Sequence, residues 1–218
     1  MRILYFHQFY AGPEAPGPRQ PRDLVRLLAE RGHRVDVVAC DLNAYNEQTE
    51  PEETFETAAG GAVRVHRLKT SRNLRANLLN RLKTYGRFAW AAYRFGPTLP
   101  SPDVVLATIQ PLFGGYAALQ LARRWRKPFM LEIRDLWPDA LVVKKAIAPW
   151  QAVPLQAMAR ALYFGANRVA TLTPGLKIEL LKKGIPPARL DLFPNGFNEE
   201  FFRLEAGTRE KMRAQFGW

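Results

Sequence analysis

The chain has 218 residues, of which 47% are hydrophobic, and its mean hydropathy is −0.24. This composition excludes intrinsically disordered and membrane-spanning proteins, and the single cysteine, Cys40, excludes an intrachain disulfide. The formal net charge of +12 indicates an anionic partner, such as lipid headgroups, a phosphorylated substrate or nucleic acid. The length suits one large α/β domain, whose core needs neither disulfides nor metals.

The first forty residues have the pattern of a βαβ unit. The apolar run 2–6 predicts a buried strand, and a loop rich in Gly and Pro follows it at 11–20. Leucines at helical spacing then predict a helix that ends at Gly32, because glycine commonly terminates helices. The segment "RVDVVAC" at 34–40 predicts a second strand, and we interpret Cys40 at its end as a packing residue.

The rest of the sequence continues to alternate strands with helices. The segment 41–60 carries only acidic charges and predicts an exposed loop. Further strands are predicted at 62–68, 103–108, 128–133, 167–172 and 190–193, and helices at 72–95, 111–125 and 174–183. The stretch 139–165 is predicted to be mostly helical, with breaks at Pro149 and Pro154. Most strands are continuous Val, Leu and Ile runs, so we predict an α/β fold with a doubly wound, mostly parallel sheet. Ligands bind such sheets beyond the carboxyl ends of the strands.

The loop after the first strand is one candidate binding site, because its backbone N–H groups can approach a phosphate. Gly12 and Gly17 are five residues apart, so the loop matches neither the dinucleotide-binding glycine pattern nor a Walker A loop. A dehydrogenase and a P-loop NTPase are therefore not favoured. His7 ends the preceding strand, and we interpret it either as a hydrogen-bonded structural residue or as a ligand contact.

Charged residues gather where the strand at 128–133 ends, in "LEIRDLWPDA". Charges next to a buried strand are costly unless they pair or meet a ligand. Two interpretations stay open: Arg134 pairs with Glu132 or Asp135, or the group binds a ligand. Trp137 and the proline after it either wall a pocket or pack in the core. Further along, Thr173 fits a helix N-cap, with contact to a phosphate or sugar hydroxyl as a second possible role.

Three segments, in this order, resemble family 4 glycosyltransferases. They are "RGHRVDVVA" at 31–39, "EIRDLWPD" at 132–139 and "RVATLTPGLKIELLKKGIPPARLDLFPNGFNEEFF" at 168–202. The resemblance is closest to the branch that builds bacterial cell-surface polysaccharides, of the O-antigen or capsule type, by adding sugars to lipid-linked intermediates. It implies the GT-B architecture, in which an acceptor-binding and a donor-binding Rossmann-like half face a cleft.

This resemblance implies a domain organisation and a reaction. Residues 1–198 would be the acceptor-binding domain, and 199–218 a linker or the start of a donor-binding domain. The carboxylate pair of the donor half, E-x7-E, does not follow Phe202, so we expect this chain alone to be inactive. The enzyme would retain the anomeric configuration and use a nucleotide sugar, a UDP-sugar, with no tightly bound cofactor and no metal. The alternative is a non-catalytic module, complete in itself, that binds an anionic ligand or a membrane.

The resemblance also implies roles for single residues. Many relatives have a His-Asp pair where this chain has Arg134 and Asp135. Because arginine cannot act as a base at neutral pH, Arg134 would act electrostatically or structurally. Asp135 would then polarise the acceptor hydroxyl or hold the donor sugar. The other residues assigned to substrate binding are Gly17, Arg19, His7, Glu132, Thr173 and Asn195.

The predicted helix at 72–95 mixes apolar, aromatic and basic residues, as helices that lie on anionic lipid do. The residues expected to contact the membrane are Arg75, Arg81, Arg87, Phe88 and Trp90. Alternatively, the apolar face belongs to the core and the basic residues are solvated. The partners expected are a polyprenyl diphosphate-linked glycan acceptor, an anionic membrane surface and a C-terminal donor-binding domain. No nucleic-acid-binding motif is present, and the expected location is cytoplasmic, on the inner face of the membrane.

Overall fold

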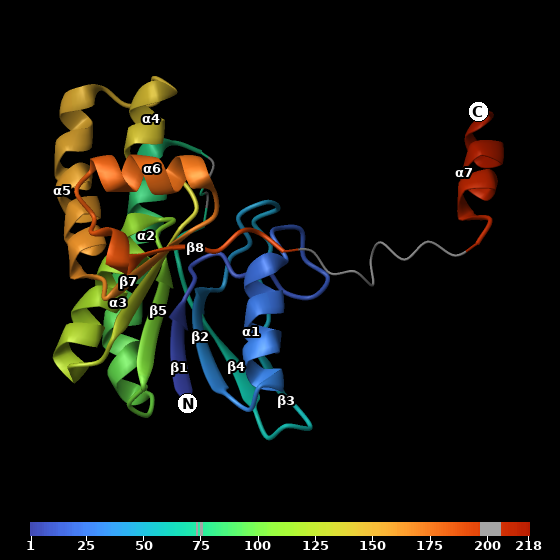
Figure 1. Ribbon diagram of the computed structural model, residues 1–218, viewed down its shortest axis with the longest axis horizontal. Coiled ribbons are helices and arrows are strands. Elements are labelled where there is room, and N and C mark those ends of the chain that lie inside the picture. The colour runs from blue at the N-terminus through green and yellow to red at the C-terminus, as the bar shows by residue number, and fades with distance from the viewer. Residues whose placement is uncertain (73, 75, 197–205) are drawn as a thin grey trace.

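The structure, a computed structural model, describes residues 1–72, 74, 76–196 and 206–218 (Figure 1). The described residues form an eight-stranded sheet in the order β3-β4-β2-β1-β5-β6-β7-β8. Its strands are β1 (Arg2–Phe6), β2 (Arg34–Cys40), β3 (Glu53–Glu56), β4 (Ala62–Leu68), β5 (Val104–Thr108), β6 (Phe129–Ile133), β7 (Arg168–Thr171) and β8 (Leu190–Leu192). Only the pairing of β3 with β4 is antiparallel. The predicted doubly wound, mostly parallel sheet is confirmed.

Helices cover both faces of this sheet. The helices of the described residues are α1 (Gln20–Glu30), α2 (Leu78–Phe95), α3 (Leu112–Trp125), α4 (Asp139–Val143), α5 (Pro149–Gly165), α6 (Pro174–Lys182) and α7 (Thr208–Phe216), with short 3-10 turns at Gly96–Thr98 and Pro187–Arg189. Residues of α1 pack on one face, and residues of α2, α3, α5 and α6 pack on the other. This two-sided cover explains why the strands read as continuous apolar runs rather than as alternating ones.

Two hydrophobic clusters fill the layers on either side of the sheet. Ile3 and Tyr5 of β1 belong to the cluster under α1, together with Val25 of that helix. Leu4 and Phe6 point the other way and belong to the larger cluster under α2, α3, α5 and α6. Successive side chains of a strand point to opposite faces, so one apolar strand supplies both layers.

The acidic segment 41–60, predicted as an exposed loop, is partly buried. It contains β3, and the side chains of Asn43 and Glu50 are buried. The prediction was wrong because basic partners lie across from the acids: Arg22 of α1 pairs with Glu53 at 2.6 Å, and Arg67 of β4 lies 3.5 Å from the same carboxylate.

Two predicted helices have different bounds. The helix expected from residue 72 begins at Leu78, because the Asn77 side chain caps it by accepting the Asn80 N–H at 2.8 Å. The helical stretch 139–165 was expected to break at Pro149 and at Pro154. It does divide before Pro149, into α4 and α5, but Pro154 lies inside α5. Lys145, in the turn between α4 and α5, has a left-handed backbone with φ of 53°, and Pro149 starts α5 at a position where helices accept proline.

Candidate active site

The carboxyl ends of β1, β5 and β6 meet in the middle of the sheet, because these strands are neighbours. Thr108 and Glu132 are paired residues of β5 and β6, so their side chains lie on the same face. Tyr5 of β1 reaches the same place and contacts both of them. Polar side chains from three strands therefore converge at the ligand-binding end of a doubly wound sheet.

The Glu132 carboxylate is the centre of this group. It is buried and accepts hydrogen bonds from the Thr108 hydroxyl at 2.9 Å, from Arg134 Nη1 at 3.3 Å and from the Tyr5 hydroxyl at 3.4 Å. Burial, reinforced by the Glu132 charge, raises the pKa of Tyr5 well above its ordinary value, so this phenol stays a donor. Of the arrangements left open by the sequence, the ion pair between Arg134 and Glu132 is present.

Arg134 also reaches across to the first helix. Its Nη1 donates to the side-chain oxygen of Gln20, the first residue of α1. The guanidinium therefore links the end of β6 to the start of α1, and it lies beside the loop that carries Gly17 and Arg19. Of the two roles considered for Arg134, these contacts favour the structural one.

Asp135 lies outside this buried group. Its side chain is exposed, and Oδ2 accepts a hydrogen bond from Gln110 Nε2 at 2.6 Å. Gln110 follows β5, so residues after two neighbouring strands fix the carboxylate. A carboxylate that is oriented by an amide and open to solvent can accept a hydrogen bond from an incoming hydroxyl.

His7 lies just beyond β1 and is buried between two aromatic rings. The ring centroid of Tyr5 is 5.6 Å away and that of Tyr10 is 6.1 Å away, both edge-on. Burial, with a smaller effect from the charge of Arg134, lowers the pKa of His7 from 6.5 to about 3. His7 is therefore neutral at physiological pH, and its Nδ1 has no hydrogen-bond partner among the described protein atoms.

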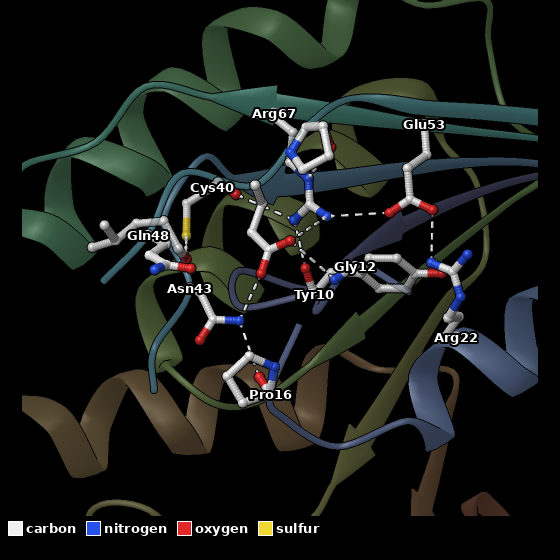
Figure 2. Close-up of polar contacts among 12 residues, drawn as sticks. Tyr10, Gly12, Pro16, Arg22, Cys40, Asn43, Gln48, Glu53 and Arg67 are labelled. Carbon is white, nitrogen blue, oxygen red and sulfur yellow. Dashed lines mark hydrogen bonds and ion pairs between the residues drawn. The ribbon is translucent and has the colours of Figure 1, made fainter. Parts of the chain in front are cut away.

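The loop after β1 is held in place by buried polar side chains (Figure 2). Glu50 accepts the backbone N–H of Gly12 at 3.2 Å and the Asn43 amide at 2.6 Å. The same Asn43 amide donates to the backbone oxygen of Pro16 at 3.0 Å. A Cβ atom at Gly12 would lie 2.6 Å from Glu50 Oε2, so glycine allows this close approach, while Gly17 adopts a φ of 146° that also favours glycine.

Arg67 is the buried cation that supports the same loop, with a side chain only 3% exposed. Its Nη1 donates to the backbone oxygen of Tyr10 at 2.5 Å, and its Nη2 lies 3.5 Å from Glu53 and 4.0 Å from Glu50. We name Glu50, Glu53 and Arg67 the loop clamp. Figure 2 shows Arg22 on the far side of Glu53, so the clamp continues into α1.

Two predicted binding residues lie apart from the Glu132 group. Thr173 is exposed and caps α6 by accepting the Leu176 N–H at 3.2 Å, so its predicted capping role is confirmed. Asn195 is exposed after β8. Among the described residues, no hydrogen bond joins either side chain to Glu132, Arg134 or Asp135.

The residues predicted to contact a membrane differ in their exposure. Trp90 is 67% exposed, and Arg94 lies over its ring at 5.7 Å. Phe88 is fully buried against Gly114 of α3, so the prediction that Phe88 touches lipid was wrong. Arg87 donates to the Ser71 hydroxyl at 3.2 Å and Arg81 to the Leu74 backbone oxygen at 3.4 Å, both from exposed positions.

The remaining predicted contact, Arg75, lies outside the described residues. None of the helices that the structure describes is long and apolar enough to cross a bilayer.

Trp137 and Pro138 wall a pocket, as one of the two interpretations of that segment expected. The pocket has a volume of about 340 Å³ and lies between the loop after β6, α5 and α6. Asp139 lines this pocket, and its carboxylate accepts hydrogen bonds from Lys183 Nζ at 2.5 Å and from Gln156 Nε2 at 3.1 Å. The acidic group of this pocket is therefore already paired within the protein.

Sequence reasoning missed several residues of the site. Thr108 ends the strand predicted at 103–108 and Gln110 follows it, at the end of the sheet where ligands bind, but both are uncharged and did not stand out. Gln20 is 114 residues from Arg134, and no local pattern indicates that they meet. Glu50 was overlooked because an acidic run usually indicates a solvated surface.

Comparisons with known proteins agree with this architecture. A family model described as a glycosyl transferase 4-like domain matches residues 18–196. HepE of Anabaena in complex with UDP-glucose is similar in structure, with a TM-score of 0.52 and 13% sequence identity over 100% of this chain and 50% of HepE. HepE with UDP and glucose has a TM-score of 0.53, with the same identity and coverage.

At 13% identity, the likeness to HepE is one of fold. The chain spans about half the length of these similar structures. A comparison with curated proteins found no match.

Proposed function

Because the chain belongs to the glycosyl transferase 4-like domain family, we propose that it is the acceptor-binding half of an enzyme that transfers a sugar from a nucleotide-sugar donor. The acceptor is a polyprenyl diphosphate-linked glycan, and the product is a cell-surface polysaccharide of the O-antigen or capsule type. The donor is a UDP-sugar, and transfer retains the anomeric configuration. The enzyme works at the cytoplasmic side of the inner membrane.

In this proposal, residues 1–198 are the acceptor domain, and 199–218 lead toward a donor-binding half. Support comes from the similar structures, half of whose length this chain covers. The chain alone is then inactive, because the E-x7-E carboxylate pair and most of the basic residues that hold the donor belong to the other half.

The observation that carries the proposal is the exposed Asp135 carboxylate, held at 2.6 Å by Gln110 beyond the ends of β5 and β6. An acceptor hydroxyl that donates to this carboxylate becomes a better nucleophile as its proton is drawn away. The fixed orientation of Asp135 also lowers the entropy lost when donor and acceptor meet.

The first loop supplies a complementary group for negative charge. Arg19 precedes α1, whose N-terminus carries a partial positive charge. We assign Gly17 and Arg19 to the side of the site that faces the leaving diphosphate, where positive charge stabilises the transition state. Arg134 positions this loop through Gln20, and Glu132 in turn holds Arg134. His7, Thr173 and Asn195 remain assigned to substrate contact.

The test uses the intact product of the gene that encodes this chain. The purified protein is incubated with a panel of UDP-sugars and polyprenyl diphosphate-linked oligosaccharides, and products are analysed by mass spectrometry. We expect one donor to add a single sugar to the acceptor, and we expect residues 1–218 alone to yield none. A folded intact protein that consumes no nucleotide sugar with any acceptor would contradict the proposal.

A further inference from the structure

Helix α5 exposes large apolar side chains at its N-terminal end, although Gln156 and Arg160 further along are exposed polar residues. Its inner side is buried, with Ala159 and Leu162 in the core. On the solvent side, Trp150 is 74% exposed and Val153 is 59% exposed. Phe164, at the other end of the helix, does not belong to this group, because the Arg160 guanidinium lies 4.6 Å from its ring centroid. Large apolar side chains that gather in solvent at one end of a helix indicate a contact surface.

The chain just before α5 extends this apolar surface. Val143, the last residue of α4, is 81% exposed, and Lys144 and Lys145 follow it, both exposed. Figure 1 shows α4 beside α5 at one side of the molecule, and the two helices are in contact. We name Val143, Lys144, Lys145, Trp150 and Val153 the α4–α5 tip.

The tip is a fixed structure rather than a loose loop. Ile147, between the two helices, is buried. The N–H of Lys145 donates to the backbone oxygen of Val142 at 2.9 Å, and the N–H of Ala146 donates to that of Leu141 at 2.9 Å. The exposed apolar side chains are therefore presented by an ordered turn, which reduces the entropy lost when they bind a surface.

We propose that the α4–α5 tip docks on an anionic lipid bilayer, with Trp150, Val153 and Val143 at the headgroup boundary and the two lysines against lipid phosphates. This inference rests on the proposed function only in assuming that the enzyme meets a membrane. The proposed contact surface differs from the one predicted on α2. Both helices pack against α3, but the exposed tryptophan of α2 is Trp90 and that of α5 is Trp150.

The charges around the tip favour an anionic surface. Within the described part of the chain, neither Lys144 nor Lys145 forms an ion pair. Asp139, the acid of α4 itself, is already paired with Lys183 at 2.5 Å. Lysines that flank an exposed tryptophan match the arrangement of a bilayer surface, where phosphates lie just outside the apolar layer.

The same charges argue against a second copy of the chain as the partner. A two-fold symmetric contact places the same patch on both sides of the interface. Lys144 and Lys145 of the two copies would then be brought together without acidic partners, and such like-charge contacts are unfavourable. A lipid surface provides the opposite charge without this conflict.

The experiment measures co-sedimentation of residues 1–218 with phosphatidylcholine vesicles, and with vesicles that also contain phosphatidylglycerol. The test variant carries Trp150→Gln and Val153→Ser, and a second variant carries Lys144→Gln and Lys145→Gln. The matched control is Trp90→Gln, which removes an exposed tryptophan from α2. All changes are at exposed positions, and circular dichroism verifies that the variants stay folded.

We expect wild-type protein to prefer the anionic vesicles and both tip variants to bind them about tenfold more weakly or worse, since apolar and basic contacts add. Tip variants that bind as well as wild type would overturn the inference, whether or not Trp90→Gln weakens binding. Wild-type protein that binds neither vesicle would also overturn it. A wild-type dimer that Trp150→Gln dissociates, seen by sedimentation velocity, would reassign the tip to self-association.

A second assay measures sugar transfer to an acceptor that is solubilised in detergent, where no bilayer is needed. It tests the proposed function independently of vesicle binding. If the intact enzyme transfers sugar in detergent but the tip variants bind vesicles normally, only the docking inference fails. If vesicle binding depends on the tip but no sugar is transferred, the proposed function fails and the docking surface stands.

Discussion

The Arg134 guanidinium lies 3.3 Å from the carboxylate of Glu132, and both side chains are largely buried where β6 ends. Of the two interpretations that the sequence left open for these residues, an ion pair or a ligand contact, the ion pair is present. The exposed Asp135 beside them remains open to solvent. This division of roles, with a buried pair that supports and an exposed carboxylate that contacts substrate, leads to the predictions below.

Replacing Arg134 should destabilise the fold. The change Arg134→Met keeps the apolar stem of the side chain but leaves Glu132 charged and buried without its cation. We expect the free energy of unfolding to fall by about 3 kcal/mol, measured by urea denaturation. The matched control is Arg168→Met, which breaks an exposed ion pair with Asp191 and should cost about 1 kcal/mol or less. Equal losses for the two variants would argue against a buried supporting pair.

The pH dependence of stability should carry a contribution from His7. Its pKa is about 3 in the folded chain but 6.5 ordinarily, so below pH 6.5 the unfolded chain binds a proton that the folded chain does not. The contribution of neutral His7 to the free energy of unfolding is thus fully present above pH 6.5, and it declines as the pH falls toward 3. Between pH 7.5 and pH 5 the wild type should lose about 2 kcal/mol more than His7→Asn. Parallel curves for the two proteins would mean that His7 titrates normally.

The loop clamp should control the mobility of the loop after β1. The change Glu50→Ala removes the acceptor of the Gly12 N–H and of the Asn43 amide. We expect hydrogen exchange of the Gly12 amide to accelerate by about tenfold or more, because one lost hydrogen bond of about 1.5 kcal/mol to a charged group corresponds to that factor.

Its matched control is Glu52→Ala, which changes an exposed acid two residues away. Exchange at Gly12 should stay at the wild-type rate in this variant. Acceleration by both changes would indicate that the acidic charge of the segment, rather than the Glu50 contacts, holds the loop.

Most strands of the sheet could be predicted because each is a short continuous run of apolar residues. The bounds of β1 and β2 match the predicted runs at 2–6 and 34–40, since a strand buried on both faces is apolar throughout. Strand β3, "ETFE", was missed for the opposite reason. Glu56 is exposed, and Glu53 is accommodated because Arg22 and Arg67 lie across from it, a proximity that the sequence does not reveal.

The site was predicted in part, for a similar reason. The position of Glu132, Arg134 and Asp135 after a buried strand could be predicted from local pattern, and their pairing was among the alternatives. The partners Gln20 and Gln110 could not be predicted, because only the tertiary fold brings them to Arg134 and Asp135. Phe88 was misassigned because aromatic residues on a basic helix look alike whether they face lipid or the core, and here the glycine at position 114 makes room for the ring.

The most direct test of the account is the turnover of the intact enzyme with Asp135→Asn. Asparagine keeps the shape of the side chain, and its oxygen can still accept from Gln110, but it loses the charge that draws the proton from the acceptor hydroxyl. At saturating donor and acceptor, we predict a kcat about 100-fold or more below wild type with little change in KM. An unchanged kcat would contradict the assignment of Asp135 as the residue that activates the acceptor.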